Sequence, residues 1–479
     1  MIAKASAITG TATMAASAIA LVRNRIIATL QGTEGIGIIG QFTSLQSLLM
    51  LLAGFGLTTG VIKYLSQYLT SKEYDRISRS FSSALFIVLC CSAITSVALI
   101  LFSNQISLIL MGDDSVQIYV VIIAASIPMG ALSSLYNSLI NGARDIKSLA
   151  RISVYSSLGA LIIAVPAVYF LGMVGVIVQI AAASAVSFVL TFAMSRKIAR
   201  NWPISLEGPR FDIIESKLLL HYGVVTLITT MLLPATLLVT QTVIIHQEGL
   251  AANGLFTAAW SLFWIYIGFA TGSIAVYLMP TMSATRKQED LSMQINNGVR
   301  FLAVVTTPIA CIILLFPSTI LTILYSPDFA DASWLLRVMV IAGAFRIVSF
   351  PIANMFVAKG HLREYLPIES SWFVVFGGIV IILLPTKGLD AIAYAVLAAY
   401  IVHTTLFVLF AKRILGLGYT KRVWSILAIS TVLLALVLAL TQVSQIVSYA
   451  MTAACIPIWF FYTTEKGERR WLLSKFTSH

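Results

Sequence analysis

Two arginines interrupt the first long apolar segment of the chain, which ends "SAIALVRNRIIATLQGTEG". Arg23 and Arg25 lie in it, and Arg337 and Arg346 lie in a later apolar segment. An arginine at the centre of a bilayer costs about 3 kcal/mol on insertion scales. The single acid inside the apolar segments is Glu369, so these segments carry a surplus of positive charge. Because a guanidinium binds two phosphate oxygens at once, this surplus predicts a cavity that selects an anion.

The four arginines differ in predicted depth. Arg346 lies twelve residues from each end of the apolar segment 334–358, so it must face water, a partner or an anionic substrate. Arg337 is shallower, and its side chain can extend to the outer membrane surface. Arg23 and Arg25 are two positions apart, which places them about 200° apart around a helix, so they cannot share one outlet.

Polar and aromatic residues indicate which segments face the predicted cavity. Isolated Ser and Thr residues usually join membrane helices, but their density here favours a wet cavity. The remaining candidate substrate-binding residues are Asn24, Gln41, Asn137, Trp260 and Trp264, together with Glu369. His403 is a candidate proton-coupling group, although a lone histidine in a membrane helix is more often a hydrogen-bonded packing residue.

The composition predicts an all-α polytopic membrane protein. Of the 479 residues, 59% are hydrophobic and 10% are charged, and apolar runs long enough to cross a bilayer recur throughout. About fourteen transmembrane helices are predicted, at residues 5–30, 36–62, 81–102, 117–141, 152–171, 173–195, 218–245, 253–282, 300–324, 334–358, 367–385, 389–411, 423–441 and 444–463.

An internal repeat organises these helices. Shifted by 214 residues, the segment 34–55 matches 248–269 at nine of 22 positions. The shift spans six helices, an even number, so both copies enter the membrane from the same side. We therefore predict two six-helix lobes with a substrate path between them, followed by two extra helices. The predicted domains are 1–200, a cytoplasmic linker 201–217, 218–411, and 412–479 with its cytoplasmic tail.

The remaining features argue against several other classes of protein. The net charge of +12 comes mostly from loops expected to face anionic headgroups, so no nucleic-acid partner is predicted. No P-loop and no nucleophile–base arrangement occurs, which predicts a protein that is not an enzyme. The four cysteines lack metal-ligand spacing, and no cofactor or metal is expected, while ion or proton coupling stays open.

Five stretches make the chain resemble a known family. They are "AKAS" (3–6), "GTEGIGIIGQF" (32–42), "GVIKYLSQY" (60–68), "VYLMPTMS" (276–283) and "AKGHLREYLPIES" (358–370). With them, residues 1–411 resemble the O-antigen and enterobacterial-common-antigen flippases of the multidrug/oligosaccharidyl-lipid/polysaccharide exporter superfamily. Arg25, Arg346 and Glu369 match positions where the family has a basic or acidic group, whereas Arg23 is additional.

The resemblance implies a flippase that carries an undecaprenyl-diphosphate-linked oligosaccharide from the cytoplasmic to the periplasmic leaflet of the bacterial inner membrane. Its implied partners are that lipid-linked oligosaccharide, the membrane, and polymerase and chain-length proteins of the polysaccharide pathway. A multidrug cation antiporter of the same superfamily remains the alternative, but hydrophobic cations require buried carboxylates. A structural or assembly membrane protein is also possible, but such a protein would need no arginines near the middle of the bilayer.

The distribution of basic residues predicts the topology and its test. With the N-terminus inside, 26 of 31 Lys and Arg residues lie in cytoplasmic segments or helix edges, and both termini are cytoplasmic. Reporter fusions should therefore be active in the cytoplasm after residue 205 and in the periplasm after residues 248 and 330. A cytoplasmic signal at residue 330 would contradict the repeat.

Overall fold

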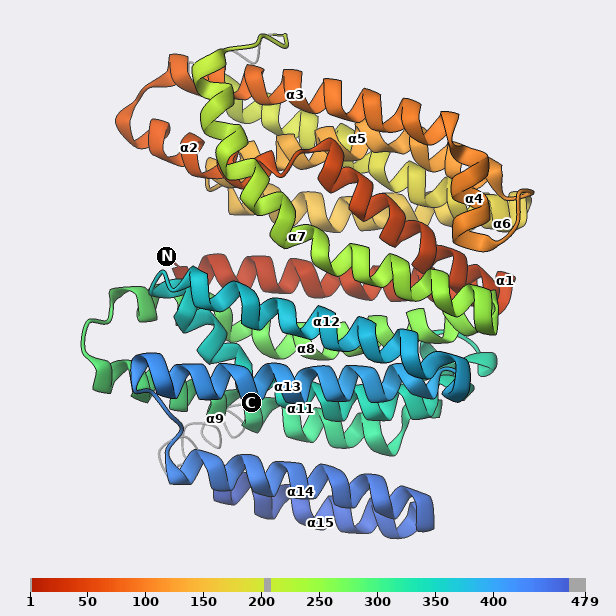
Figure 1. The fold of residues 1–479 in the computed structure, drawn as a ribbon, viewed down its shortest axis with the longest axis vertical. Coiled ribbons are helices and arrows are strands. Elements are labelled where there is room, and N and C mark those ends of the chain that lie inside the picture. The colour runs from red at the N-terminus through yellow and green to blue at the C-terminus, as the bar shows by residue number, and fades with distance from the viewer. Residues whose placement is uncertain (1, 202–207, 465–479) are drawn as a thin grey trace, which may run out of the picture. The chain divides into compact units, whose positions relative to one another are not determined.

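The chain forms helices joined by short turns. The computed structural model describes residues 2–201 and 208–464, and within these ranges no β-strand occurs. The helices of the first half are α1 (Ile2–Ala53), α2 (Leu57–Ser71), α3 (Tyr74–Leu101), α4 (Ser103–Met111), α5 (Gln117–Gly142), α6 (Ile146–Asn201) and α7 (Ile213–Glu248). Those of the second half are α8 (Leu250–Ala284), α9 (Gln288–Leu315), α10 (Pro317–Leu324), the 3₁₀ helix η1 (Pro327–Ala332), α11 (Ser333–Ala358), α12 (Leu362–Lys387), α13 (Asp390–Leu415), α14 (Lys421–Val443) and α15 (Gln445–Thr463) (Figure 1).

Twelve segments of the described chain are long and apolar enough to cross a membrane. Two of these, within α1 and α6, are each divided by a glycine with non-helical backbone angles: Gly32 (φ 65°, ψ −156°) and Gly172 (φ 57°, ψ −130°). Residues with a Cβ rarely adopt such angles, so glycine lets one span end and the next begin without a loop. Counted on each side of these breaks, the spans of the described chain agree in number with the predicted helices, and the chain is an all-α polytopic membrane protein.

The sequence did not predict the shorter helices. The second predicted span, 36–62, ends instead at Ala53, and α2 begins at Leu57 after a turn in which Phe55 and Gly56 have positive φ angles. The helix α4 occupies a segment predicted to be an outside loop, and α10 is a separate short helix where the sequence predicted the end of the span 300–324. They were missed because eight or nine apolar residues are too few to cross a bilayer, and only their length distinguishes them from the flanking spans.

The helix bounds support the internal repeat. Helices α3 and α9 both begin and end 214 residues apart, and α4 and α10 begin 214 residues apart. The repeated segments also contact each other near Gly37 and Gly254. A Cβ on Gly37 would lie 2.4 Å from the Leu250 carbonyl oxygen, and one on Gly254 would lie 1.9 Å from the Thr33 carbonyl oxygen. Glycine at both positions lets the two backbones touch.

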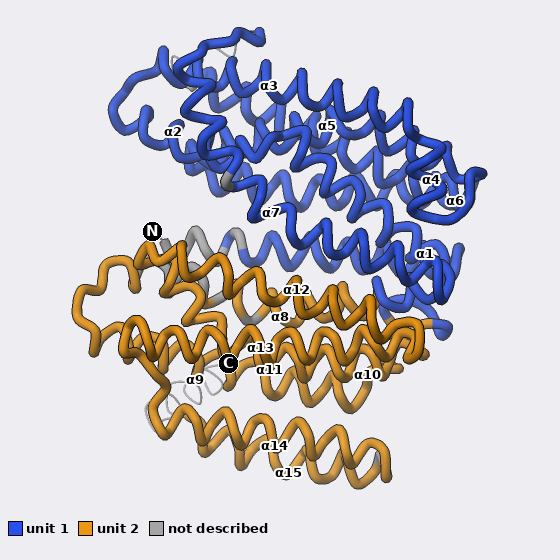
Figure 2. Tube along the Cα trace, viewed as in Figure 1, with its two compact units in different colours: residues 1–257, 324–328 blue, residues 258–323, 329–479 orange. Residues whose placement is uncertain are grey.

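The described chain separates into two compact units, drawn in blue and orange in Figure 2. Unit 1 comprises residues 1–257 and 324–328, and unit 2 comprises 258–323 and 329–479. In unit 1, α5 packs against α3 and α6, and α6 packs against α1. In unit 2, α13 packs against α11 and α12, and α14 packs against α9 and α15. The predicted division into lobes at 201–217 stays a prediction.

The glycine breaks generate a stability prediction. Gly172→Ala should lower the free energy of unfolding by about 1–3 kcal/mol because alanine is strained at φ 57°. Gly172 has space around it, since the nearest atom to a built Cβ is 4.0 Å away, so the effect would report backbone strain alone. Thermal unfolding in detergent measures it. The control is Gly377→Ala, which lies within α12, meets no atom within 4 Å and should not destabilise.

Candidate functional site

Three helices of unit 2 bring ionisable side chains together. Arg346 of α11 donates from Nη2 to Glu369 Oε1 of α12 at 3.4 Å. His403 of α13 places Nε2 at 3.2 Å from both Glu369 Oε2 and Arg346 Nη1. The His403 side chain is 1% exposed, and those of Arg346 and Glu369 are 17% and 27% exposed. The structure thus joins three of the predicted site residues into one group, the Arg346–Glu369–His403 triad.

The triad allows two hydrogen-bond arrangements. When His403 carries its proton on Nε2, that atom donates to Glu369. When the proton lies on Nδ1, Nε2 accepts from Arg346. The Nδ1 atom is buried and has no hydrogen-bond partner among the described residues. The position of one proton therefore decides which neighbour His403 binds, and its role in proton coupling stays a prediction.

An aromatic cluster of unit 2 lies beside the triad. Trp260 is 7% exposed, and its ring centroid lies 5.9 Å from that of Trp264 and 6.1 Å from that of Trp372. Trp372 stacks on Phe376 with centroids 4.8 Å apart. The sequence analysis missed Trp372, although it follows Glu369 by three positions and so shares its helix face. Trp260 is largely covered by other rings, whereas Trp264 is half-buried.

In unit 1, Arg23, Asn24 and Arg25 have different surroundings. Arg25 Nη1 donates to the backbone carbonyl of Tyr325 at 2.6 Å, and Tyr325 is fully buried. Among the described residues, Arg23 Nη2 reaches only the Oδ1 atom of Asn24, at 3.4 Å, and the buried Nε atom of Arg23 has no partner. The two arginines therefore have different hydrogen-bond partners, and whether each side chain reaches the membrane surface stays a prediction.

Gln41 and Asn137 lie in unlike surroundings within unit 1. Gln41 is fully buried, and its Nε2 atom donates to Thr242 Oγ1 at 2.8 Å, which ties α1 to α7. Asn137 is exposed on α5. The contacts of Gln41 are those of a residue that joins helices, and substrate binding by both side chains stays a prediction.

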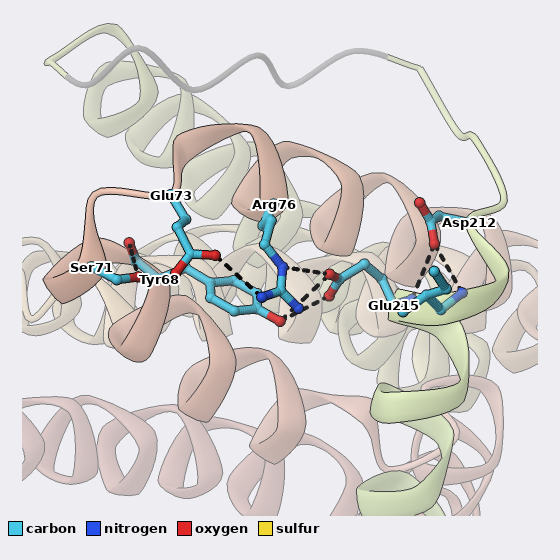
Figure 3. A network of polar contacts seen from close by, with 7 residues as sticks. Tyr68, Ser71, Glu73, Arg76, Asp212 and Glu215 are labelled. Carbon is cyan, nitrogen blue, oxygen red and sulfur yellow. Dashed lines mark hydrogen bonds and ion pairs between the residues drawn. The ribbon is translucent and has the colours of Figure 1, made fainter.

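Unit 1 contains a polar network that the sequence analysis did not identify (Figure 3). The Arg76 Nε atom of α3 lies 3.1 Å from Glu215 Oε1 of α7, and the Tyr68 hydroxyl of α2 donates to Glu215 Oε2 at 3.1 Å. The Glu215 side chain is 6% exposed. Burial, together with the Glu215 carboxylate, raises the pKa of Tyr68 to about 12. Asp212 caps α7 by accepting from the backbone N–H of Glu215 at 3.1 Å, which places this carboxylate in the first turn.

The network was missed because its residues are far apart in sequence. Arg76 and Glu215 look like ordinary charges at helix ends, and only the packing of α7 against α2 and α3 brings them together. The one available signal was the capping residue Asp212 followed by a carboxylate three positions later.

Solved structures of transporters share this fold. A structure of the lipid II flippase MurJ in an inward closed conformation covers 94% of this chain and 97% of its own, with a TM-score of 0.76 and 14% identity. An inward-facing multidrug resistance MATE transporter of the MOP superfamily covers 86% of this chain and 98% of its own, with a TM-score of 0.70 and 16% identity. These comparisons place the chain in the class of polytopic helical transporter folds.

The sequence comparisons give the family. Residues 2–286 match the family described as "Polysaccharide biosynthesis protein", and the chain belongs to that family. Lipid III flippase from Escherichia coli K12 is 26% identical over 417 residues, which are 86% of this chain and 99% of the relative. The Shigella flexneri protein of the same name matches equally well. The resemblance predicted from five short stretches is confirmed.

The triad predicts a large effect of removing one partner. Glu369→Gln leaves the Arg346 guanidinium without its counter-ion, which should lower the free energy of unfolding by about 3 kcal/mol. Thermal unfolding of the purified protein measures the loss. The matched control is Glu289→Gln at an exposed position of α9, which should change stability by less than about 0.5 kcal/mol. Equal stability of the two variants would show that the ion pair does not stabilise the fold.

Proposed function

We propose that this protein is a flippase that moves an undecaprenyl-diphosphate-linked oligosaccharide from the cytoplasmic to the periplasmic leaflet. The observation that carries the proposal is the match to lipid III flippase, which extends over 99% of that protein's length. Family membership and the transporter fold agree with it. A flippase makes and breaks no covalent bond, so the protein acts as a transporter without enzymatic chemistry.

The arginines supply a physical rationale for a diphosphate substrate. Arg25 in unit 1 and Arg346 in unit 2 each present a guanidinium, a group whose planar fork binds two phosphate oxygens at once. Arg346 already pairs with Glu369, and a diphosphate would compete with that carboxylate for the guanidinium. When the diphosphate replaces Glu369 at the Arg346 guanidinium, a shift of the His403 proton between its two ring nitrogens can compensate. The neutral ring can then donate to Glu369 or accept from Arg346. Alternating access of the two lobes around this substrate completes the mechanism.

The oligosaccharide and its lipid set the remaining requirements. Sugar hydroxyls need hydrogen-bonding side chains, and sugar faces stack on aromatic rings such as that of Trp264. The polyprenyl chain can stay in the bilayer while the headgroup crosses. The proposed location is the bacterial inner membrane with both termini in the cytoplasm, where polymerase and chain-length proteins of the pathway would act on the product.

A multidrug cation antiporter is the second candidate, favoured by the MATE-like fold. The charges of the membrane segments oppose it, because Glu369 is paired with Arg346 and therefore poorly suited to bind a hydrophobic cation. Proton-driven export of ethidium by the purified protein in vesicles would favour the antiporter and displace the flippase proposal.

The diphosphate role of Arg25 and Arg346 can be tested in cells. Alanine at either position should abolish assembly of the surface polysaccharide, because the diphosphate loses a cationic contact on its path. Arg→Lys should retain partial function, since the charge remains but the bidentate geometry is lost. Surface glycan and the membrane level of the protein are measured together, so that misfolded variants are recognised.

Exposed Arg210 provides the control for this test. Arg210→Ala should leave the glycan at its normal level, because Arg210 is exposed and lies outside the proposed contacts with the diphosphate. Normal glycan in the Arg346→Ala strain would refute the two-arginine mechanism while leaving the fold and family unaffected.

A further inference from the structure

Unit 1 contains an open cavity, lined by both polar and apolar side chains, that the diphosphate mechanism does not use. Its volume is about 310 Å³, and its lining comes from α1, α5 and α6. Polar side chains contribute much of the lining, in particular Arg23, Gln46, Ser133, Ser134, Gln179 and Ser187. A cavity of this size lies at the lower end of the range for small-molecule sites, about 300–1,000 Å³.

Part of this lining is already hydrogen-bonded. The Gln46 amide donates to Ser126 Oγ at 2.7 Å and to Ser184 Oγ at 3.2 Å. The hydroxyls of Ser133 and Ser187 lie 2.7 Å apart. These bonds hold the polar side chains in place, so the wall of the cavity is preorganised.

Two polar groups of the lining residues remain without partners in the described structure. The Oε1 atom of Gln179 is buried and unbonded, and the Gln179 side chain is 1% exposed. The Nε atom of Arg23 is also buried and unbonded. Buried polar atoms normally have a partner, so an unpaired acceptor and an unpaired charged donor make the wall of this cavity unusually polar for a membrane protein interior.

The charge of the cavity is equally informative. Other arginines of the membrane segments have acceptors on a different segment: Arg346 pairs with Glu369, Arg25 donates to the Tyr325 carbonyl, and Arg337 donates to the Leu314 carbonyl. Arg23 has only the 3.4 Å contact with Asn24. The described residues that line the cavity include no carboxylate, so its side chains carry one uncompensated positive charge.

From this geometry we propose that the Arg23 cavity binds a singly charged oxyanion carried by a hydroxyl-rich group the size of one sugar ring. The guanidinium meets the oxyanion, and the hydroxyls of Ser133, Ser134 and Ser187 donate to or accept from sugar hydroxyls. The single charge matches a sugar carboxylate, whereas a diphosphate carries more charge than one arginine balances. The inference rests on the proposed function in one respect: an acidic sugar of the transported oligosaccharide is the ligand expected in the cell.

The experiment compares three probes on the purified full-length protein in nanodiscs. Glucuronate, glucose and inorganic phosphate are titrated separately, with saturation-transfer NMR and calorimetry as readouts. Glucuronate should bind at least tenfold more tightly than glucose, and also more tightly than phosphate. Equal binding of glucuronate and glucose would overturn the proposal, and tighter binding of phosphate would show that the site serves a phosphate group instead.

Variants locate the binding in this cavity. Arg23→Gln removes the charge and should weaken glucuronate binding at least tenfold, and Ala183→Leu narrows the cavity and should weaken glucose and glucuronate alike. Arg337→Gln removes a membrane arginine from the other unit and should leave glucuronate affinity unchanged. Unchanged binding by both cavity variants would overturn the proposal. The probe comparison on the unmodified protein decides it even where a variant does not fold.

The outcome is separable from that of the flippase proposal. Loss of surface glycan in Arg25 and Arg346 variants, with glucuronate affinity independent of Arg23, would refute the cavity proposal alone. Glucuronate binding that depends on Arg23, with normal glycan in those variants, would support the cavity and refute the two-arginine mechanism.

Discussion

A charge inside hydrocarbon must recover its lost hydration from a partner, and this constraint decides where the arginines of the chain can lie. A backbone carbonyl meets Arg25 and another meets Arg337, and each supplies a fixed dipole without a counter-charge. Arg346 instead meets the carboxylate of Glu369. Helix packing in each unit follows from this, because the acceptor comes from a different segment each time. Each of these arginines thus contributes a charge and also favours packing of its own segment against the segment that carries its acceptor.

The type of partner also determines what each arginine can do. A guanidinium held by a carboxylate can exchange that partner for a substrate anion, since one negative group replaces another. A guanidinium held by a carbonyl keeps its net charge and attracts an anion at longer range. A guanidinium at a cavity wall, as at Arg23, has space for a ligand without displacing anything. These three situations within one chain suit a substrate whose anionic groups differ in charge and position.

The sequence predicted the spans and the grouping of charges better than the fine packing. Apolar length locates a span, and Gly172 marked the loop-free break between two of them, so these predictions hold. The sequence also singled out Glu369 as the one acid inside the apolar segments, and the structure pairs it with Arg346. The Arg76–Glu215 pair, the rings around Trp372 and the cavity at Arg23 were not predicted, because they depend on side-chain contacts between helices distant in sequence. Hydrophobic periodicity in the sequence indicates which face of a helix is buried, but it does not indicate which other helix packs against that face.

The unequal burial of Arg76 and Glu215 decides which of the two residues can be substituted first during evolution. Arg76 is 39% exposed and Glu215 is 6% exposed, so the two partners tolerate isolation unequally. A lineage that first loses Glu215 keeps an arginine that water can solvate. A lineage that first loses Arg76 keeps a buried carboxylate with only the Tyr68 hydroxyl as a remaining side-chain donor, at a cost of several kcal/mol. Homologues that retain the glutamate without the arginine should therefore be rarer than the reverse, and sequences that lack both should have passed through the loss of the acid.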